Sequence, residues 1–254
     1  MRIGLLLVIQ LACSAVSFHG VCCRTAALTR IASHPQIVPQ NDFWEIVVVT
    51  GKGNSASTHA GVSTLYTLDA ATGRMQKRGT SDRVCSGNTY YRIGWPGQGP
   101  GKIARALTWN RVLNTDEIQQ VATHLTGTIK AAIFDLNAAA QTSSTPKDSK
   151  KGMTFKNMAV KTDDTLPYWD LNNNYLERSG GGSLKDGQFY THAYVLKWRV
   201  SDKGWRTLLR HNNDHCIIVR DGGKDLGMYS NRKDGFRDSG YNVRGHACRV
   251  TCSC

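Results

Sequence analysis

The sequence predicts an all-β fold, a β-sandwich with one short helix near residues 114–126. Short segments of strand-like alternation recur along the chain, and turn signals such as Thr72-Gly73, Asp221-Gly222 and Asp234-Gly235 separate them. One segment alone combines a helix-capping pattern with helical periodicity. With 254 residues, the chain is long enough for one large β domain or two small ones.

The amino terminus, MRIGLLLVIQLACSAVS, predicts a secretory signal peptide over residues 1–17. A basic Arg2 precedes an apolar run, and Ala15-Val16-Ser17 fits a small-x-small cleavage site. An uncleaved anchor or a wrongly assigned start is the alternative. No later stretch approaches the ~20 apolar residues that cross a bilayer, so we expect no membrane span. The predicted localisation is secreted and extracellular.

Cysteine usage and charge narrow the class of partner. Seven of the eight cysteines follow the predicted signal, and an odd number implies an unpaired or intermolecular thiol. Several of them lie in a Cys-rich tail, residues 244–254. The net charge is +13, yet no run of five like charges occurs, so the chain has no basic tail. For an exported basic protein we expect an acidic polysaccharide or an anionic surface, not nucleic acid.

The glycine-rich stretch GWPGQGPGKIARALTW, residues 94–109, is predicted to be a turn that leads into a strand. A phosphate-binding loop would need Gly where Pro96 stands and Ser or Thr where Ile103 stands. The prolines also remove backbone donors that a phosphate would require. Alternation in KIARALTW, residues 102–109, indicates a strand.

A capped helix is expected directly after this strand. Asn114 can cap it, with Glu117 at the position that completes a capping box. The apolar stripe that follows consists of Ile118, Val121 and Leu125.

The first block of the chain, residues 40–127, resembles the carboxyl-terminal half of a laminin-G-like domain, a concanavalin A-like jelly roll. The resemblance rests on the glycine turn, the strand that ends in Trp-Asn-Arg and the Leu-x-x-x-Glu-Ile helix start at residues 113–118. Upstream, FWEIVVVTGKG (43–53), STLYTLDAATGRM (63–75) and CSGNTYYRIGW (85–95) look like the family's preceding strands. The implied fold is a jelly-roll β-sandwich.

The second block, residues 165–243, resembles the amino-terminal half of the same family. Its segments are YVLKWRV (194–200), which alternates like a half-buried strand, WRTLLRHNNDHCIIV (205–219) and DGGKDLGMYSNRKDGF (221–236). Residues 128–164, which include QTSSTPKDSKKG, are predicted to be a linker or exposed loop.

The closing half of the domain therefore precedes the opening half. Three explanations are compatible with this order. The halves assemble into one circularly permuted sandwich, or each is a remnant of a tandem array, or the chain is a truncated gene model. Half a sandwich exposes an apolar sheet face and open edges, which favours assembly within the chain.

Two sets of candidate site residues follow. For a glycan, the candidates are an aromatic ring in the glycine turn and basic side chains that suit acidic groups, namely Trp95, Arg92, Lys102, Arg206 and Arg210. The resemblance implies calcium at the sandwich rim, for which the candidate ligands are Asp214, Asp221 and Asp225. The histidines of HNNDH, His211 and His215, offer a zinc alternative across a turn.

Catalysis is not expected, because hydrolases on this fold use paired carboxylates on one strand and the sequence has no such pair. We expect a secreted, non-enzymatic module that binds extracellular carbohydrate, preferably an acidic glycan, or a cell-surface or matrix protein. The alternatives are a glycoside hydrolase or lyase on the same fold, or a non-functional fragment of a larger multi-repeat surface protein.

Overall fold

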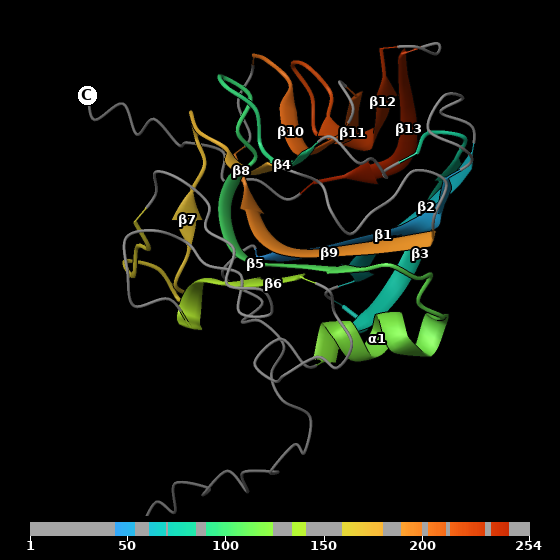
Figure 1. Cartoon of the computed structure of the whole chain (residues 1–254), viewed down its shortest axis with the longest axis horizontal. Helices are drawn as coiled ribbons and strands as arrows, with labels where there is room; N and C mark the ends of the chain where they lie inside the picture. The colour runs from blue at the N-terminus through green and yellow to red at the C-terminus, as the bar shows by residue number, and fades with distance from the viewer. Residues whose placement is uncertain are drawn as a thin grey trace, which may run out of the picture. The chain divides into compact units, whose positions relative to one another are not determined.

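The structure, a computed structural model, describes residues 44–53, 61–69, 71–84, 90–123, 134–140, 159–179, 189–199, 203–211, 214–231 and 235–243. These residues form two antiparallel β-sheets that face each other, with one helix on the far side of the larger sheet (Figure 1). They belong to one compact unit, residues 34–254. The predicted all-β sandwich with one short helix is therefore confirmed.

The larger sheet, sheet A, has seven strands. In spatial order they are β3 (Arg74–Ser81), β2 (Gly61–Asp69), β1 (Glu45–Gly53), β9 (Phe189–Trp198), β5 (Gly101–Trp109) and β6 (Phe134–Asn137), with β7 (Trp169–Asp170) also paired to β5. A short 3-10 helix, η2 (Ala138–Ala140), follows β6.

The smaller sheet, sheet B, has six strands. In spatial order they are β13 (Gly235–Asn242), β12 (Asp225–Ser230), β11 (Asp214–Val219), β10 (Arg206–His211), β4 (Tyr90–Ile93) and β8 (Leu176–Ser179). The hairpins β2–β3, β10–β11, β11–β12 and β12–β13 lie where the turn signals predicted them.

Both blocks of the sequence contribute to both sheets. Strand β9, from the second block, lies between β1 and β5 of the first block. Strand β4, from the first block, lies between β10 and β8 of the second. Each block alone would leave strands without neighbours, and together they form the two sheets.

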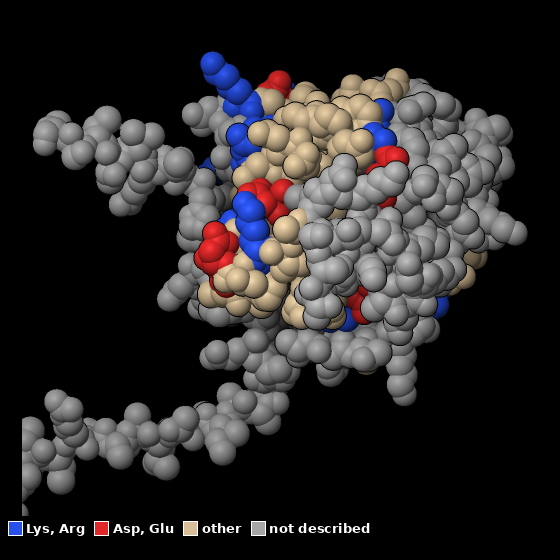
Figure 2. All heavy atoms as spheres, turned by 60° about the vertical axis from the view of Figure 1, so that its left-hand side comes forward, with Lys and Arg blue, Asp and Glu red and all other residues tan. Residues whose placement is uncertain are grey.

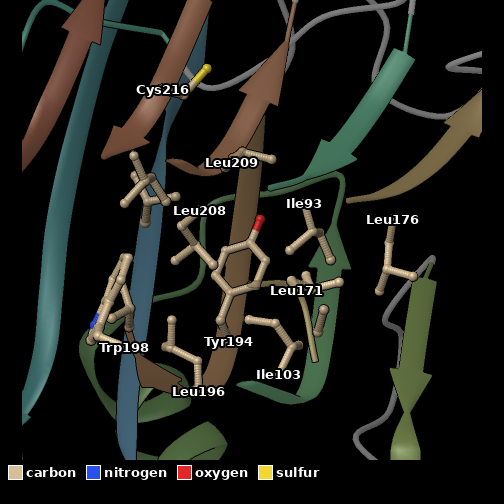
Figure 3. Packing of buried hydrophobic residues seen from close by; sticks show 14 of the residues in the cluster. Ile93, Ile103, Leu171, Leu176, Tyr194, Leu196, Trp198, Leu208, Leu209 and Cys216 are labelled. Atoms are coloured by element: carbon tan, nitrogen blue, oxygen red, sulfur yellow. The ribbon is translucent and has the colours of Figure 1, made fainter. Parts of the chain in front are cut away.

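The core lies between the sheets and is made of large apolar side chains from both. Figure 3 shows Tyr194, Leu196 and Trp198 of β9 packed towards Leu208 and Leu209 of β10. All five are at most 3% exposed, so they are removed from water. Burial of this apolar surface is the main term that holds the sheets together.

Sheet A is also covered on its outer face. Helix α1 (Thr115–Thr123) packs Ile118 and Val121 against Leu107 and Trp109 of β5. The predicted capping box is present: the Asn114 side-chain oxygen accepts the Glu117 amide at 2.9 Å, and the Glu117 carboxylate accepts the Asn114 amide at 2.9 Å. The rest of the predicted stripe, Leu125, lies outside the described residues.

A second piece of chain, residues 161–170, covers the other part of this outer face. Tyr168 packs against Trp44 and Val195 there. The prediction of a half-buried strand at residues 194–200 is therefore wrong for β9, since Val195 and Lys197 are 2% and 6% exposed. Alternation with polar residues suggested a solvent face, but α1 and residues 161–170 remove that face from water.

The predicted linker, residues 128–164, contains an ordered strand. Strand β6 pairs with β5 from Thr108↔Phe134 to Arg105↔Asn137, and Arg105 forms a buried ion pair with Asp135 at 2.8 Å. The predicted signal, residues 1–17, and the Cys-rich tail, residues 244–254, lie outside the described residues. Within the described part of the chain, no helix is long and apolar enough to cross a membrane.

Candidate functional site on the outer face of sheet B

Sheet B carries a row of polar and aromatic side chains on the face directed away from sheet A. Register pairs Glu177 of β8 with Arg92 of β4, Arg92 with Arg210 of β10, and Arg210 with His215 of β11. At the other edge, Tyr229 of β12 is paired with Phe236 of β13. We call the outer row the set Glu177, Arg92, Arg210, His215, Tyr229 and Phe236.

Strand alternation explains why these residues share one face. Tyr91 and Ile93, on either side of Arg92, belong to the core between the sheets, as does Cys216, which follows His215. Successive side chains of a strand point to opposite faces, so Arg92 and His215 point outwards. The row has one member from each of the six strands.

The glycine turn places Trp95 on this row. Gly94 has φ +85°, a conformation that favours glycine, and the Trp95 carbonyl accepts the Gln98 amide at 2.9 Å. The Gln98 carbonyl in turn accepts the Thr207 amide of β10 at 2.8 Å, which ties the turn to the sheet. At Gly99, a Cβ atom would lie 1.4 Å from the Leu171 carbonyl oxygen, so only glycine fits.

Two guanidinium groups lie against the indole ring of Trp95. The guanidinium carbon of Arg210 is 3.5 Å from the ring centre, and that of Arg92 is 4.6 Å from it. Arg92 also lies 4.4 Å from the ring centre of Tyr175 and forms an ion pair with Glu177. Arg210 is 9% exposed and the Arg92 side chain 14% exposed. The two cations are thus held in fixed positions, with a small part of each residue exposed.

His215 fixes the orientation of Arg210. Nε2 of His215 lies 2.8 Å from a terminal nitrogen of Arg210, and Nδ1 lies 2.7 Å from the Thr207 hydroxyl. Since a guanidinium only donates, Nε2 must accept, and the ring proton of the neutral imidazole is on Nδ1. Thr207 then accepts from Nδ1 and donates to the Gln98 side-chain oxygen at 3.0 Å.

Burial and the neighbouring charge of Arg210 lower the pKa of His215 to about 4, and Asp214 opposes this shift. The imidazole is therefore neutral at neutral pH, as the contact with Arg210 requires. A protonated ring would lose its acceptor and place two cations side by side.

The row continues as an aromatic cluster at the β12–β13 edge. The Trp205 ring centre lies 5.5 Å from that of Tyr229 and 5.7 Å from that of Phe236, both in edge-to-face geometry. The exposed Arg220 lies beside this cluster, with its guanidinium carbon 5.9 Å from the Phe236 ring centre. These rings are half-buried, so each presents part of its surface to solvent.

The structure brings three of the five predicted glycan residues together, namely Trp95, Arg92 and Arg210. Arg206 is buried and donates to the carbonyl oxygens of Trp205 and Lys203, so it braces the turn that carries Trp205. Burial and the charge of Arg199 lower its pKa.

Lys102 lies on sheet A and does not join the outer row. Its ammonium group donates to Asp164 at 2.7 Å, and Lys197 donates to the other oxygen of the same carboxylate at 2.7 Å. Burial opposes ionisation of Asp164, but the hydrogen bonds from the two lysines outweigh it and hold its pKa well below the usual range. This cluster fastens residues 161–170 onto sheet A.

The three predicted calcium ligands do not meet at one rim. Asp214 begins β11, whereas Asp221 and Asp225 lie beyond its other end. An extended segment of this length separates them by about 20 Å. Asp214 accepts hydrogen bonds from the Ser230 hydroxyl and the Asn231 amide, and Asp221 accepts one from the Gly204 amide. Among the described residues, no group of three or more His, Cys, Asp or Glu side chains is arranged to hold a metal.

The two histidines of HNNDH lie on opposite faces of sheet B. The ring of His211 packs in the core beside His192 and Tyr91, at 5.6 Å and 5.3 Å between ring centres. The ring of His215 lies on the outer row, 5.9 Å from that of Trp95. The register His211↔Asp214 and Arg210↔His215 makes them neighbours on alternate faces, so they do not share a zinc ion.

Sequence reasoning did not assign four members of the outer row to the glycan site, namely Glu177, His215, Tyr229 and Phe236. Tyr229 and Phe236 lie in segments with weak alternation, and His215 was considered only as a metal ligand. Alternation around the turn does not indicate the face of His215, because Cys216 and Ile217, which follow it, both belong to the core.

The charge of the surface is mixed where it can be seen. Figure 2 shows Lys and Arg side chains next to Asp and Glu side chains on one face of the molecule. The net charge of +13 therefore does not appear there as one continuous basic field.

The chain matches no protein-family model, no curated protein and no solved structure with which it was compared.

Proposed function

We propose that the chain is a secreted, non-enzymatic module that binds acidic extracellular carbohydrate on the outer face of sheet B. The observation that carries this proposal is the contact of Arg92 and Arg210 with the Trp95 ring. Aromatic rings suit the apolar faces of sugars, and guanidinium groups suit carboxylate and sulfate groups through paired hydrogen bonds. The resemblance to laminin-G-like domains supports the same class of function.

Preorganisation of the two arginines supports binding further. Arg210 is held by His215 and Trp95, and Arg92 by Glu177, Tyr175 and Trp95. A ligand would therefore not have to order two long side chains, which otherwise opposes binding. The alternative hydrolase requires paired carboxylates, whereas the outer row contains a single one, Glu177, already paired with Arg92.

The test is calorimetric titration of the full chain with hyaluronan, with heparin and with neutral dextran, each with calcium and with a chelator. We expect the two acidic polymers to bind, with an affinity that falls as salt rises, and dextran not to bind. Calcium dependence would support a rim site formed with further ligands. Equal binding to dextran, or no binding to any polymer, would contradict the proposal.

Variants at Arg210 localise the site. Arg210→Ala should weaken binding of the acidic polymers, and Arg210→Lys, which keeps the charge but loses the planar contact with Trp95, should restore part of it. The matched control is Arg74→Ala on β3, because Arg74 is exposed on the other sheet and its loss changes the net charge by the same amount. An equal effect of the control would mean that binding is non-specific.

A further inference from the structure

The outer row has two ends of different chemistry, joined by a chain of rings. Successive ring centres are 5.9 Å apart from Trp95 to His215 and 6.2 Å apart from His215 to Tyr229. The chain continues over 5.5 Å to Trp205 and 5.7 Å to Phe236. No step exceeds the range of ring-to-ring contact, so the rings form one continuous strip.

The strip is longer than one sugar ring. It passes from the turn after β4 to His215 on β11 and Tyr229 on β12, then to Trp205, which directly precedes β10, and to the Phe236 ring, which lies over Gly227 of β12. Arg220 is five residues beyond His215, the register partner of Arg210, and an extended segment of this length covers about 17 Å. A monosaccharide would cover one end of the strip and leave the other in water.

Positive charge is placed at both ends of the strip and not at its centre. Arg92 and Arg210 lie at the Trp95 end, and the exposed Arg220, which directly follows β11, lies beside the Phe236 ring at the other end. Between them lies His215, whose lone pair is used to accept from Arg210 and which is therefore neutral. Acidic groups of a ligand are thus favoured at two separated points, with an apolar contact between them.

We propose that the ligand is a chain of acidic sugars that lies along the strip, with one acidic group at Arg92 and Arg210 and another at Arg220. The residues between those groups stack on the strip, with Trp205 and Phe236 as the principal surfaces at the second end. This inference rests on the proposed function, and specifies that a polymer, not a single acidic sugar, is recognised.

The experiment compares hyaluronan disaccharide, tetrasaccharide and hexasaccharide by calorimetric titration of the full chain. We expect the affinity to rise at least about tenfold from the disaccharide to the hexasaccharide, because the longer chain reaches both ends. Arg220→Ala and Phe236→Leu should remove most of this gain and weaken binding of the disaccharide far less than binding of the hexasaccharide. Heparin fragments of equal length test whether sulfate groups replace carboxylates at the same two points.

Two controls keep the test specific. Phe189→Ala removes a 48% exposed ring from sheet A, and Arg74→Ala removes an exposed arginine there; neither should alter the length dependence. A near-ultraviolet circular dichroism spectrum confirms that each variant is folded. If Phe236→Leu does not fold, Trp205→Phe takes its place.

The possible failures are distinguishable. If the disaccharide binds as tightly as the hexasaccharide and Arg210→Ala still weakens both, the extended site is wrong and the proposed function stands. If none of the hyaluronan or heparin fragments binds, the proposed function itself is overturned.

Discussion

The two sheets of this sandwich differ in what lies on their outer faces. Sheet A is covered by its own chain, since α1 packs on Leu107 and Trp109 and residues 161–170 pack on Trp44 and Val195. The outer face of sheet B instead carries arginines and half-buried rings. A sheet buried on both faces is a structural layer, whereas a face that keeps rings and cations in contact with water is suited to a ligand.

The same contrast appears in how the charged groups are used. On sheet A, the buried pair Arg105 and Asp135 and the cluster around Asp164 join one segment of chain to another. On sheet B, Arg210 takes a neutral partner, His215, and contacts an aromatic ring. Arg92, also on sheet B, forms an ion pair with Glu177, so the contrast lies in Arg210, whose contacts include a neutral imidazole and an aromatic ring.

The largest expected effect tests whether sheet A is the structural layer. Leu107→Ala removes a fully buried side chain between β5 and α1 and leaves a cavity. We expect the free energy of unfolding to fall by about 2–5 kcal/mol, measured by urea denaturation. Affinity for hyaluronan in the folded protein should not change. A loss of affinity without a loss of stability would reverse the roles assigned to the two sheets.

The next effect concerns pH and His215. Its pKa in the folded chain is about 4, below the ordinary 6.5, so the unfolded chain binds more protons between these values. The free energy of unfolding therefore has its full value above about pH 6.5. It falls as the pH drops towards 4, by at most about 3 kcal/mol.

The control for this effect is His215→Gln, which can still accept from Arg210 but does not titrate. The difference in unfolding free energy between the two proteins, measured from pH 7 to pH 4, isolates His215 from His192 and His211. A constant difference across that range would show that His215 does not titrate as described.

A third effect is expected at Arg210, and it is measured as binding by the folded variant. Arg210→Ala removes a charge-assisted contact, worth about 1.5–3 kcal/mol, which corresponds to a roughly tenfold to hundredfold weaker affinity for hyaluronan. Calorimetric titration at one fixed salt concentration measures it. An unchanged affinity would place the ligand elsewhere than on the outer row.

The smallest effect is at the cap of the covering helix. Asn114→Ala removes the oxygen that accepts the Glu117 amide, which should lower the free energy of unfolding by about 1 kcal/mol. Thermal denaturation measures the change, and Asn114→Asp, which retains an acceptor, is the matched control. If the alanine and aspartate variants are equally stable, the cap does not contribute.

Much of the fold could be predicted because its signals are local. The capping box at Asn114, the turn at Gly73 and the hairpin β10–β11 each depend on residues close together in the sequence. The site was predicted in part from the aromatic and basic character of Trp95, Arg92 and Arg210, but Trp95 lies beyond the end of β4, so strand alternation does not indicate its face. Lys102 alternates in the same way, but its strand belongs to the other sheet.

The sequence by itself determined most of the strands, the hairpin turns and the start of the helix, because periodicity and capping act over a few residues, but it did not indicate β6, which lies in the predicted linker. Only the tertiary structure decided that β9 lies between β1 and β5, that β4 lies beside β10, and that residues from Arg92 to Phe236 form one row. Antiparallel pairing joins residues more than a hundred positions apart, and many alternative pairings satisfy the same alternation. Burial of the shared core selects one of them, and with it the face on which Trp95, Arg210 and His215 meet.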